Sequence, residues 1–194
     1  MTVKQCAEFL AEFVRRPGVV GAVAPSSPVL ARRMVEWIDW PKVQTVVEYG
    51  PGTGAFTGRI LAEKPPAATF FALEINPRFV AALADRYPEV NVYQESVGNV
   101  QAVCGKEGVA HVDAILCGLP WAAFSDEDQT AYLDAMMAVL RPGGQFVTFA
   151  YLQGLLLPAG QRFRRKLRRY FATVEMSRTA WRNFPPAFVY RCRR

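Results

Sequence analysis

Three glycines at alternate positions follow a short apolar run, and this stretch constrains the fold more than any other. Residues 43–49 contain three valines and Glu48, a composition typical of a buried parallel strand that ends in an acid. Glycines at these positions allow a sharp turn and let a ligand approach the backbone. Residues 56–61 predict a helix, whose first N–H groups would face such a ligand. The three glycines are Gly50, Gly52 and Gly54.

Three kinds of nucleotide site use glycine loops of this sort. A phosphate-binding P-loop is excluded because no lysine follows the glycines. A dinucleotide site expects G-x-G-x-x-G and a second βαβ half, whereas this chain has G-x-G-x-G. The third kind binds S-adenosylmethionine and places an acid at the end of the next strand. Glu74 follows the strand predicted at 69–73 and could accept hydrogen bonds from ribose hydroxyls.

Strand and helix patterns alternate along the rest of the chain, which predicts an α/β fold with a doubly wound, mostly parallel sheet. Further strands are expected at residues 90–93, 112–116 and 145–151, and helices at 78–87 and 126–140. Two last strands, at about 171–178 and 187–192, predict a C-terminal antiparallel hairpin. The sheet then has seven strands, with helices on both faces. At 194 residues the chain is expected to form one structural domain.

The first forty residues are predicted to form helices that cover the cofactor site, ahead of a core at 41–194. One face of residues 4–14 suits either core packing or a lipid surface, and both interpretations stay open. That face carries Phe9, Leu10, Phe13 and Val14. A helix at 29–40 follows Ser26 and Ser27, and either serine can cap it and face the carboxylate of the cofactor.

Ligands of doubly wound sheets bind at the carboxyl ends of the strands, and several candidate residues fall there. Glu95 follows the third strand beside Ser96, and its carboxylate could accept a hydrogen bond from an adenine amino group. Cys117 follows the fourth strand and Ile75 follows Glu74. The predicted cofactor-binding residues are Ser26, Ser27, Glu48, Gly50, Gly52, Gly54, Glu74, Ile75, Glu95, Ser96 and Cys117.

The net charge of +6 is unevenly distributed. Residues 159–194 contain eleven Lys or Arg and one acid, Glu175, while the remaining residues hold 12 bases and 16 acids. This asymmetry predicts an anionic partner, either membrane or nucleic acid, with a merely solvated helix face as the alternative.

Other features exclude several classes of protein. The four cysteines form no C-x-x-C pair, so we expect reduced thiols and no metal site. His111 is the single histidine, which excludes a site that needs two imidazoles. The longest apolar stretch, at 146–160, is too short and too interrupted to span a bilayer, and no signal-peptide pattern is present. We therefore expect a cytoplasmic protein.

Four segments together carry a resemblance to a known family. The chain resembles the bacterial phospholipid N-methyltransferases and their relatives that act on other aminolipids such as ornithine lipids, a family related to the rRNA adenine dimethylases. The segments are Phe13-Val14-Arg15-Arg16-Pro17 with Gly21-Ala22-Val23-Ala24-Pro25-Ser26-Ser27, Glu48-Tyr49-Gly50-Pro51-Gly52-Thr53-Gly54, Gly118-Leu119-Pro120, and Arg182-Asn183-Phe184-Pro185-Pro186-Ala187.

The resemblance implies a class I S-adenosylmethionine-dependent methyltransferase with a Rossmann-like fold. The glycines would line the cofactor, Glu74 would hold its ribose, and Glu95 and Ser96 would face its adenine. Ser26 and Ser27 would lie near its methionine end. The expected substrate-binding residues are Gly118, Leu119, Pro120, Trp121, Tyr151 and Asn183.

One position departs from the related adenine dimethylases, which carry Asn-Leu-Pro-Tyr/Phe after strand four. Here Gly118 replaces the Asn and supplies no side-chain acceptor, which counts against base methylation. Trp121 could instead stack on or enclose a cationic amine. No general base is evident, and Tyr151, at the end of strand five, is the candidate catalytic residue that would contact the amine.

The expected reaction is methyl transfer from S-adenosylmethionine to the primary amine of phosphatidylethanolamine or an ornithine lipid. The N-terminal helix and the apolar and basic segment at 152–170 would bind an anionic membrane, peripherally at the inner face of the cytoplasmic membrane. No nucleic-acid or obligate protein partner is expected. Two alternatives remain: a methyltransferase acting on adenine in RNA, and a membrane-binding module without catalysis.

Overall fold

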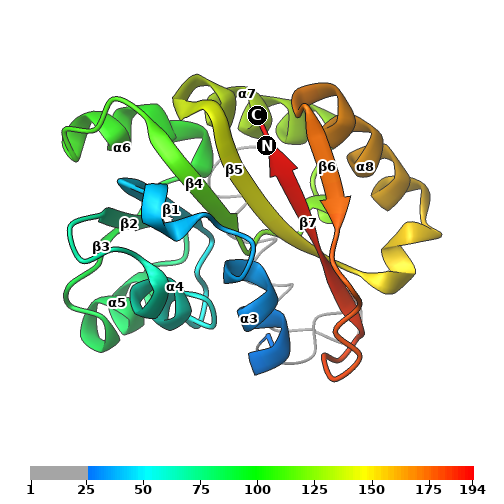
Figure 1. Ribbon diagram of the computed structural model, residues 1–194, viewed down its shortest axis with the longest axis horizontal. Helices are drawn as coiled ribbons and strands as arrows, with labels where there is room; N and C mark the ends of the chain where they lie inside the picture. The colour runs from blue at the N-terminus through cyan, green and yellow to red at the C-terminus, as the bar shows by residue number, and fades with distance from the viewer. Residues whose placement is uncertain (1–25) are drawn as a thin grey trace.

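The structure, a computed structural model, describes residues 26–194 as a seven-stranded sheet flanked by helices (Figure 1). The strand order is β3-β2-β1-β4-β5-β7-β6, and β7 runs antiparallel to both of its neighbours. This confirms the predicted mostly parallel sheet with a C-terminal antiparallel pair. The strands are β1 (Thr45–Tyr49), β2 (Thr69–Leu73), β3 (Asn91–Tyr93), β4 (Val112–Cys117), β5 (Leu140–Tyr151), β6 (Thr173–Met176) and β7 (Ala187–Arg193).

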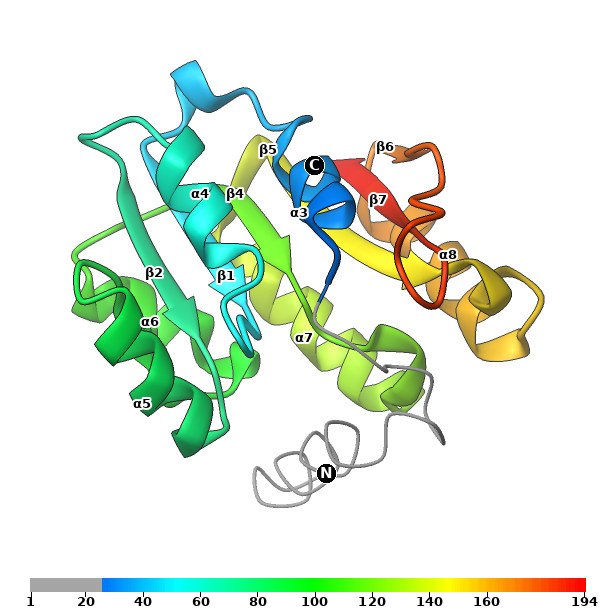
Figure 2. The ribbon, with the colours of Figure 1, turned by 90° about the horizontal axis from the view of Figure 1, so that it is seen from below.

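Helices cover both faces of the sheet. Figure 2 shows α3 and α4 separated from α6 and α7 by the strands. The helices are α3 (Pro28–Val35), α4 (Thr57–Glu63), α5 (Pro77–Arg86), α6 (Val100–Lys106), α7 (Asp126–Val139) and α8 (Pro158–Tyr170). Short 3-10 turns are η1 (Trp40–Lys42), η2 (Val97–Asn99), η3 (Trp121–Ala123) and η4 (Leu152–Leu155). The helix predicted at 4–14 lies outside the described residues.

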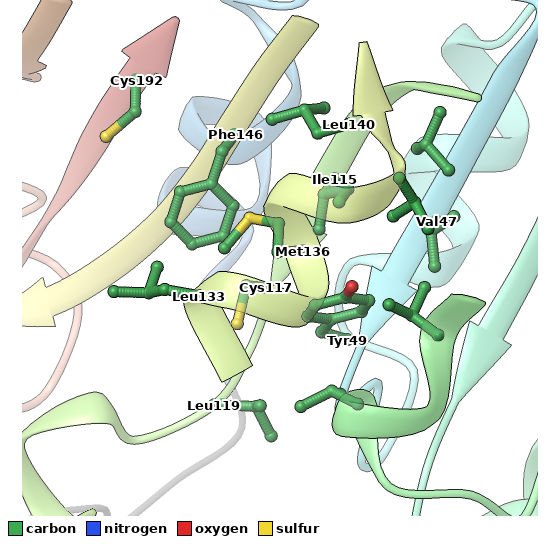
Figure 3. Close-up of a cluster of buried hydrophobic side chains, with 14 of the residues drawn as sticks. Val47, Tyr49, Ile115, Cys117, Leu119, Leu133, Met136, Leu140, Phe146 and Cys192 are labelled. Atoms are coloured by element: carbon green, nitrogen blue, oxygen red, sulfur yellow. The ribbon is translucent and has the colours of Figure 1, made fainter. Parts of the chain in front are cut away.

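Alternating side chains of the buried strands build two cores. Val47 and Tyr49 of β1 join the cluster under α6, α7 and α8, whereas Val46 joins the cluster under α3 and α4. Figure 3 shows Leu133 and Met136 of α7 over the central strands. All five residues of β1 are buried, as a parallel strand covered on both faces requires.

The helix predicted at 29–40 ends early, at Val35. A distant side chain explains the difference. The Gln145 amide on β5 accepts a hydrogen bond from the Asp39 N–H at 2.9 Å and donates one to the Trp37 carbonyl at 3.0 Å. These bonds satisfy backbone groups that a longer helix would have paired internally, so a tertiary contact ends the helix.

The structure differs from the sequence-based expectations at two further places. Residues 100–106 form α6, which sequence analysis omitted although Val100, Val103 and Cys104 have helical spacing and are buried. Strand β5 begins at Leu140 instead of 145, because the turn that follows α7 pairs with the C-terminus. The Gly143 N–H donates to the Arg194 carbonyl at 2.8 Å, and the Arg194 N–H donates to the Gly144 carbonyl at 2.9 Å.

One residue of the basic segment is part of the core. The Lys166 side chain is only 10% exposed, and its Nζ donates to the Asp126 carbonyl at 2.7 Å and to the Thr130 hydroxyl at 2.9 Å. It also forms an ion pair with the Asp126 carboxylate at 2.7 Å. This amine therefore ties α8 to the first turn of α7.

We predict that Lys166→Met destabilises the protein by about 1–3 kcal/mol, because the substitution leaves polar groups of α7 without their donor. Urea denaturation at neutral pH measures the change. Arg165→Met, at an exposed position of the same helix, is the matched control and should leave the free energy of unfolding almost unchanged. Equal effects of the two substitutions would contradict this role of Lys166.

Candidate active site

The glycine loop adopts backbone angles that few other residues tolerate. Gly50, Gly52 and Gly54 have φ values of 63°, 55° and 79°. The Gly50 N–H donates to the Leu73 carbonyl at 2.9 Å, which holds the loop over the end of β2. A Cβ at Gly54 would lie 2.9 Å from the Tyr87 ring in addition to the unfavourable φ. The loop is therefore fixed where β1 and β2 end.

Glu74 is held beside this loop by backbone donors. Its Oε2 accepts from the Gly52 N–H at 3.1 Å and its Oε1 accepts from the Asn76 N–H at 2.9 Å. The side chain is 6% exposed, and burial raises its pKa while the backbone hydrogen bonds oppose the shift. Each oxygen keeps a free lone pair, as the acceptor of a ribose hydroxyl would need.

A first cavity opens at this edge of the sheet, and we call it the cofactor cleft because six of the predicted cofactor-binding residues line it. It brings together nine of the predicted residues, namely Gly50, Gly52, Glu74, Ile75, Glu95, Ser96, Gly118, Leu119 and Pro120. It also includes residues that sequence analysis missed: Leu73, Asn76, Phe79, Val97, Phe124 and Tyr132. Phe79 lies in the first turn of the helix that follows Glu74, and this position in the sequence could have indicated that it lines the cleft. Phe124 and Tyr132 come from segments far along the chain.

Glu95 and Ser96 line the cleft and have protein partners as well. Glu95 Oε2 accepts from the Asn99 side chain at 2.8 Å, and Lys106 lies 3.6 Å from Oε1. Ser96 Oγ accepts from the Gly98 N–H at 3.3 Å and caps η2. These bonds fix the loop after β3, and contact of either residue with adenine stays a prediction.

Glu48 lies behind the glycine loop and does not line the cleft. It is fully buried, and its Oε2 accepts from the Thr57 hydroxyl at 2.7 Å, while Oε1 has no partner among residues 26–194. Burial raises the pKa of this carboxyl to about 8. Contact of Glu48 with the cofactor stays a prediction.

Other predicted site residues contribute to helix capping, loop contacts and core packing in this structure. Ser27 Oγ accepts from the Leu30 N–H at 3.2 Å and caps α3, while the Ser27 N–H donates to Asn183 Oδ1 at 2.9 Å. The Cys117 thiol points into the core, and its burial raises its pKa to about 12. Ser26, Ser27, Gly54, Cys117 and Asn183 line neither the cleft nor the cavity described next, and their predicted ligand contacts stay predictions.

A second cavity of about 330 Å³ lies on the other side of Gly118, Leu119 and Pro120, which line both spaces. Its other walls are Trp121, Ala122, Ala123, Phe149, Ala150, Tyr151, Gln153, Gly154, Leu157, Ala159, Gly160, Phe163, Phe188 and Tyr190. Within the described part of the chain, no acidic, basic or histidine side chain lines it. It can therefore desolvate a polar group without offering it a counter-charge.

Trp121 and Tyr151 differ in what they offer this cavity. The Trp121 indole is 3% exposed and stacks on Phe163 with ring centroids 4.9 Å apart, so one of its faces is already covered. Enclosing a cationic amine would need rearrangement there. Tyr151 is half-buried, burial raises its pKa, and no hydrogen bond to its hydroxyl is found among the described residues. Its hydroxyl therefore remains available for a ligand.

At Gly118 only backbone lies between the cofactor cleft and the second cavity, because this residue has no side chain. Its N–H donates to the Tyr49 carbonyl at 2.8 Å, and a Cβ on it would lie 2.6 Å from the Gly50 carbonyl oxygen. Real Cβ atoms do not approach backbone so closely, so any side chain at this position must displace the glycine loop.

We predict that Gly118→Ala lowers the affinity for S-adenosylmethionine at least about tenfold, because the methyl group displaces the Gly50 carbonyl and with it the loop. Isothermal titration measures the affinity. Gly105→Ala, where a Cβ meets nothing within 4 Å, is the matched control and should bind normally. Normal binding by Gly118→Ala would show that the loop does not depend on this contact.

We also predict a pH-dependent effect of Glu48→Gln. Because the folded pKa of about 8 exceeds the ordinary 4.5, the stability associated with protonated Glu48 is fully present below pH 4.5 and is lost as pH rises through 8. The neutral glutamine should remove this decline. The melting temperature of the ligand-free variant should exceed that of the wild type more at pH 8 than at pH 5, and parallel curves would contradict the assignment.

Comparisons with known proteins identify the family of the chain. The sequence profile of a family described as "Methyltransferase domain" matches residues 46–144. Ornithine lipid N-methyltransferase of Singulisphaera acidiphila is 30% identical over 188 residues, which cover 95% of this chain and 94% of that protein. Dimethyladenosine transferase of Yarrowia lipolytica is 32% identical over 98 residues, 49% of this chain and 29% of that protein.

Solved structures share the fold at low identity. An O-methyltransferase from Bacillus cereus in complex with SAH has a TM-score of 0.67 and 13% identity, covering 95% of this chain and 90% of that one. A SAM-dependent methyltransferase from Archaeoglobus fulgidus has a TM-score of 0.66 and 10% identity, covering 94% and 99%. With the glycine loop, Glu74 and the nearly full-length relative, these results place the chain in the family of the ornithine lipid N-methyltransferases, and it is an S-adenosylmethionine-dependent methyltransferase.

Proposed function

We propose that this enzyme methylates the primary amine of a membrane aminolipid, with phosphatidylethanolamine or an ornithine lipid as the substrate class. The observation that carries the proposal is the uncharged second cavity, which meets the cofactor cleft at Gly118, Leu119 and Pro120. The relative from Singulisphaera acidiphila, an ornithine lipid N-methyltransferase by name, supports the same class.

The proposed mechanism depends on placement and desolvation. S-adenosylmethionine supplies an activated methyl group, so alignment of the amine accounts for much of the rate. A free alkylamine has a pKa of about 10 and is mostly protonated at neutral pH. The apolar walls of the second cavity disfavour the charged amine and lower its pKa, which yields the neutral nucleophile. No described side chain of this cavity is an obvious base.

Tyr151 is the proposed contact of the amine. It lines the second cavity and ends the strand next to β4, which leads to Gly118. Its raised pKa keeps the hydroxyl protonated, so Tyr151 would position the amine and not remove a proton from it.

Membrane association is proposed for the segment at 152–170 and for the N-terminal helix, which lies outside the described residues. Exposed arginines of α8 would attract anionic headgroups with on the order of 1 kcal/mol each. They are Arg162, Arg165, Arg168 and Arg169. Lys166 is excluded from this role because it is buried. None of the described helices is long and apolar enough to cross a membrane, and we propose peripheral binding at the inner face of the cytoplasmic membrane.

Coverage of the cofactor cleft by residues 1–40 also remains a proposal. Within the described part of this segment, α3 packs on the same face of the sheet as α4 and lines neither cavity. Any cover would therefore come from residues that precede α3.

Methylation of adenine in RNA is the second candidate, and the match of 49% of this chain to a dimethyladenosine transferase favours it. The related enzymes carry Asn where this chain has Gly118, and the close contact of Gly118 with Gly50 leaves no room for that side chain. A purine also has several polar edges, for which the second cavity offers few partners.

The proposal is tested by transfer of labelled methyl from S-adenosylmethionine to a total lipid extract, with total RNA in a parallel reaction. Chromatography should find the label in an aminolipid. Label in RNA alone would overturn the lipid assignment, and the basic helix α8 would then be a phosphate-binding element.

We predict that Tyr151→Phe lowers turnover about five- to tenfold, corresponding to the loss of one hydrogen bond of about 1 kcal/mol. Affinity for S-adenosylmethionine should stay within twofold, because Tyr151 does not line the cofactor cleft. Steady-state kinetics and titration separate the two effects. Unchanged turnover would remove Tyr151 from the acceptor site.

Vesicle binding should increase with the fraction of anionic lipid and weaken with salt, because the exposed arginines act through screened charge. Co-sedimentation at 50 and 500 mM salt, about a threefold change in screening length, measures this dependence. Equal binding at the two salt concentrations would contradict an electrostatic contribution from α8.

A further inference from the structure

Four large apolar side chains near the second cavity are exposed to solvent. Trp181 and Phe184 are each 71% exposed, Leu156 is 83% exposed and Leu157 is 53% exposed. Isolated exposed apolar residues are common on soluble proteins, whereas four in adjacent segments are a candidate contact surface. We call these four residues the apolar rim.

The rim comes from two segments that lie side by side although they are far apart in the sequence. Tyr151 at the end of β5 pairs with Ala187 at the start of β7, and the Leu152 N–H donates to the Pro186 carbonyl at 2.8 Å. Figures 1 and 2 show η4 and the connection between β6 and β7 at the same end of the sheet. Leu157 also lines the second cavity, so the rim lies at its edge.

The connection that carries Trp181 and Phe184 is held by hydrogen bonds. Asn183 is 5% exposed, and its side chain accepts from the Ser27 N–H at 2.9 Å and donates to the Pro185 carbonyl at 2.7 Å. The Asn183 N–H also donates to the Ala180 carbonyl at 3.0 Å. Asn183 thus anchors the loop from within, while the aromatic residues on either side of it point to solvent.

The charges of the two segments indicate which kind of partner would bind the apolar rim. The loop at 177–186 contains Arg178 and Arg182 and no acid, and the segment at 152–170 contains no acid either. Aromatic side chains flanked by arginine are typical of proteins that bind at the boundary between headgroups and acyl chains. An apolar surface whose two segments carry only positive charges complements an anionic bilayer.

We propose that the apolar rim inserts into the interface of an anionic bilayer and places the mouth of the second cavity against the lipid headgroups. This inference rests on the proposed aminolipid substrate, and it assigns insertion to Trp181 and Phe184, separately from the electrostatic attraction of α8. Asn183 then has a defined role as the residue that holds the inserting loop to α3.

Trp181 is itself the reporter for insertion. Of the other tryptophans, Trp40 and Trp121 are buried, and Trp37 is half-buried near Gln145, in the middle of β5. With vesicles of phosphatidylcholine and phosphatidylglycerol that carry brominated acyl chains, the emission of the wild type should be quenched. The Trp181→Phe variant should lose most of this quenching, and Trp37→Phe should retain it. Equal quenching of the wild type and Trp181→Phe would overturn the proposal.

Activity gives a second and separable result. The double variant Trp181→Ser/Phe184→Ser should transfer methyl to an aminolipid in vesicles at least about tenfold more slowly than the wild type. It should act normally on a short-chain aminolipid below its micelle concentration, which needs no insertion. Equal rates on vesicles for both proteins, or an equal loss on both substrates, would overturn the role of the rim. Failure of the wild type to methylate any lipid would refute the proposed function, while the quenching experiment would still report insertion.

Discussion

The close contact of two glycines, Gly50 and Gly118, is the constraint on which the site depends. Parallel pairing of β1 with β4 brings their carboxyl ends together, and the Gly118 N–H bonds to the Tyr49 carbonyl at 2.8 Å. The separation leaves no room for a Cβ at Gly118. At Gly118, therefore, only backbone stands between the cofactor cleft and the second cavity, while Leu119 and Pro120 also line both spaces. Methyl transfer requires the amine to touch the methyl group on the sulfonium, and the absence of a side chain at Gly118 would let the two ligands approach each other there.

Electrostatics differ between the cofactor cleft and the second cavity. The buried acid Glu74 lines the cofactor cleft, where ribose hydroxyls would meet it, and Glu48 lies behind the glycine loop. The walls of the second cavity carry no charged side chain among the described residues. A carboxylate there would stabilise the ammonium form of the acceptor and hold back the nucleophile. The uncharged lining is thus consistent with methylation of an amine in its neutral form.

The sheet could be predicted from sequence because its signals are local. Buried valine runs, alternate glycines and strand-end acids each act within a few residues, and β2 was predicted with its observed bounds. The early end of α3 could not be predicted, because it depends on Gln145, more than a hundred residues away. The same limit applies to the site. Nine predicted residues line the cleft, yet Phe124 and Tyr132 reach it only through the packing of α7 and the segment before it.

Two polar residues have structural roles that composition and motifs did not indicate. Lys166 belongs to a basic run that suggested a surface role, but its amine donates hydrogen bonds to the first turn of α7. Asn183 belongs to a motif that suggested substrate contact, and in the structure its amide joins Ser27 and Pro185. In both cases the sequence marks an important residue, and only the hydrogen-bond partners reveal what the side chain does.

A crystal structure with S-adenosylhomocysteine and a short-chain aminolipid would test the central claim most directly. The account predicts ribose hydroxyls on Glu74, the adenine near Glu95 and Ser96, and the sulfur atom at Gly118, Leu119 and Pro120, facing an amine in the second cavity. A sulfur atom turned away from that cavity, or a lipid amine bound elsewhere, would contradict the assignment of the two spaces as donor and acceptor sites.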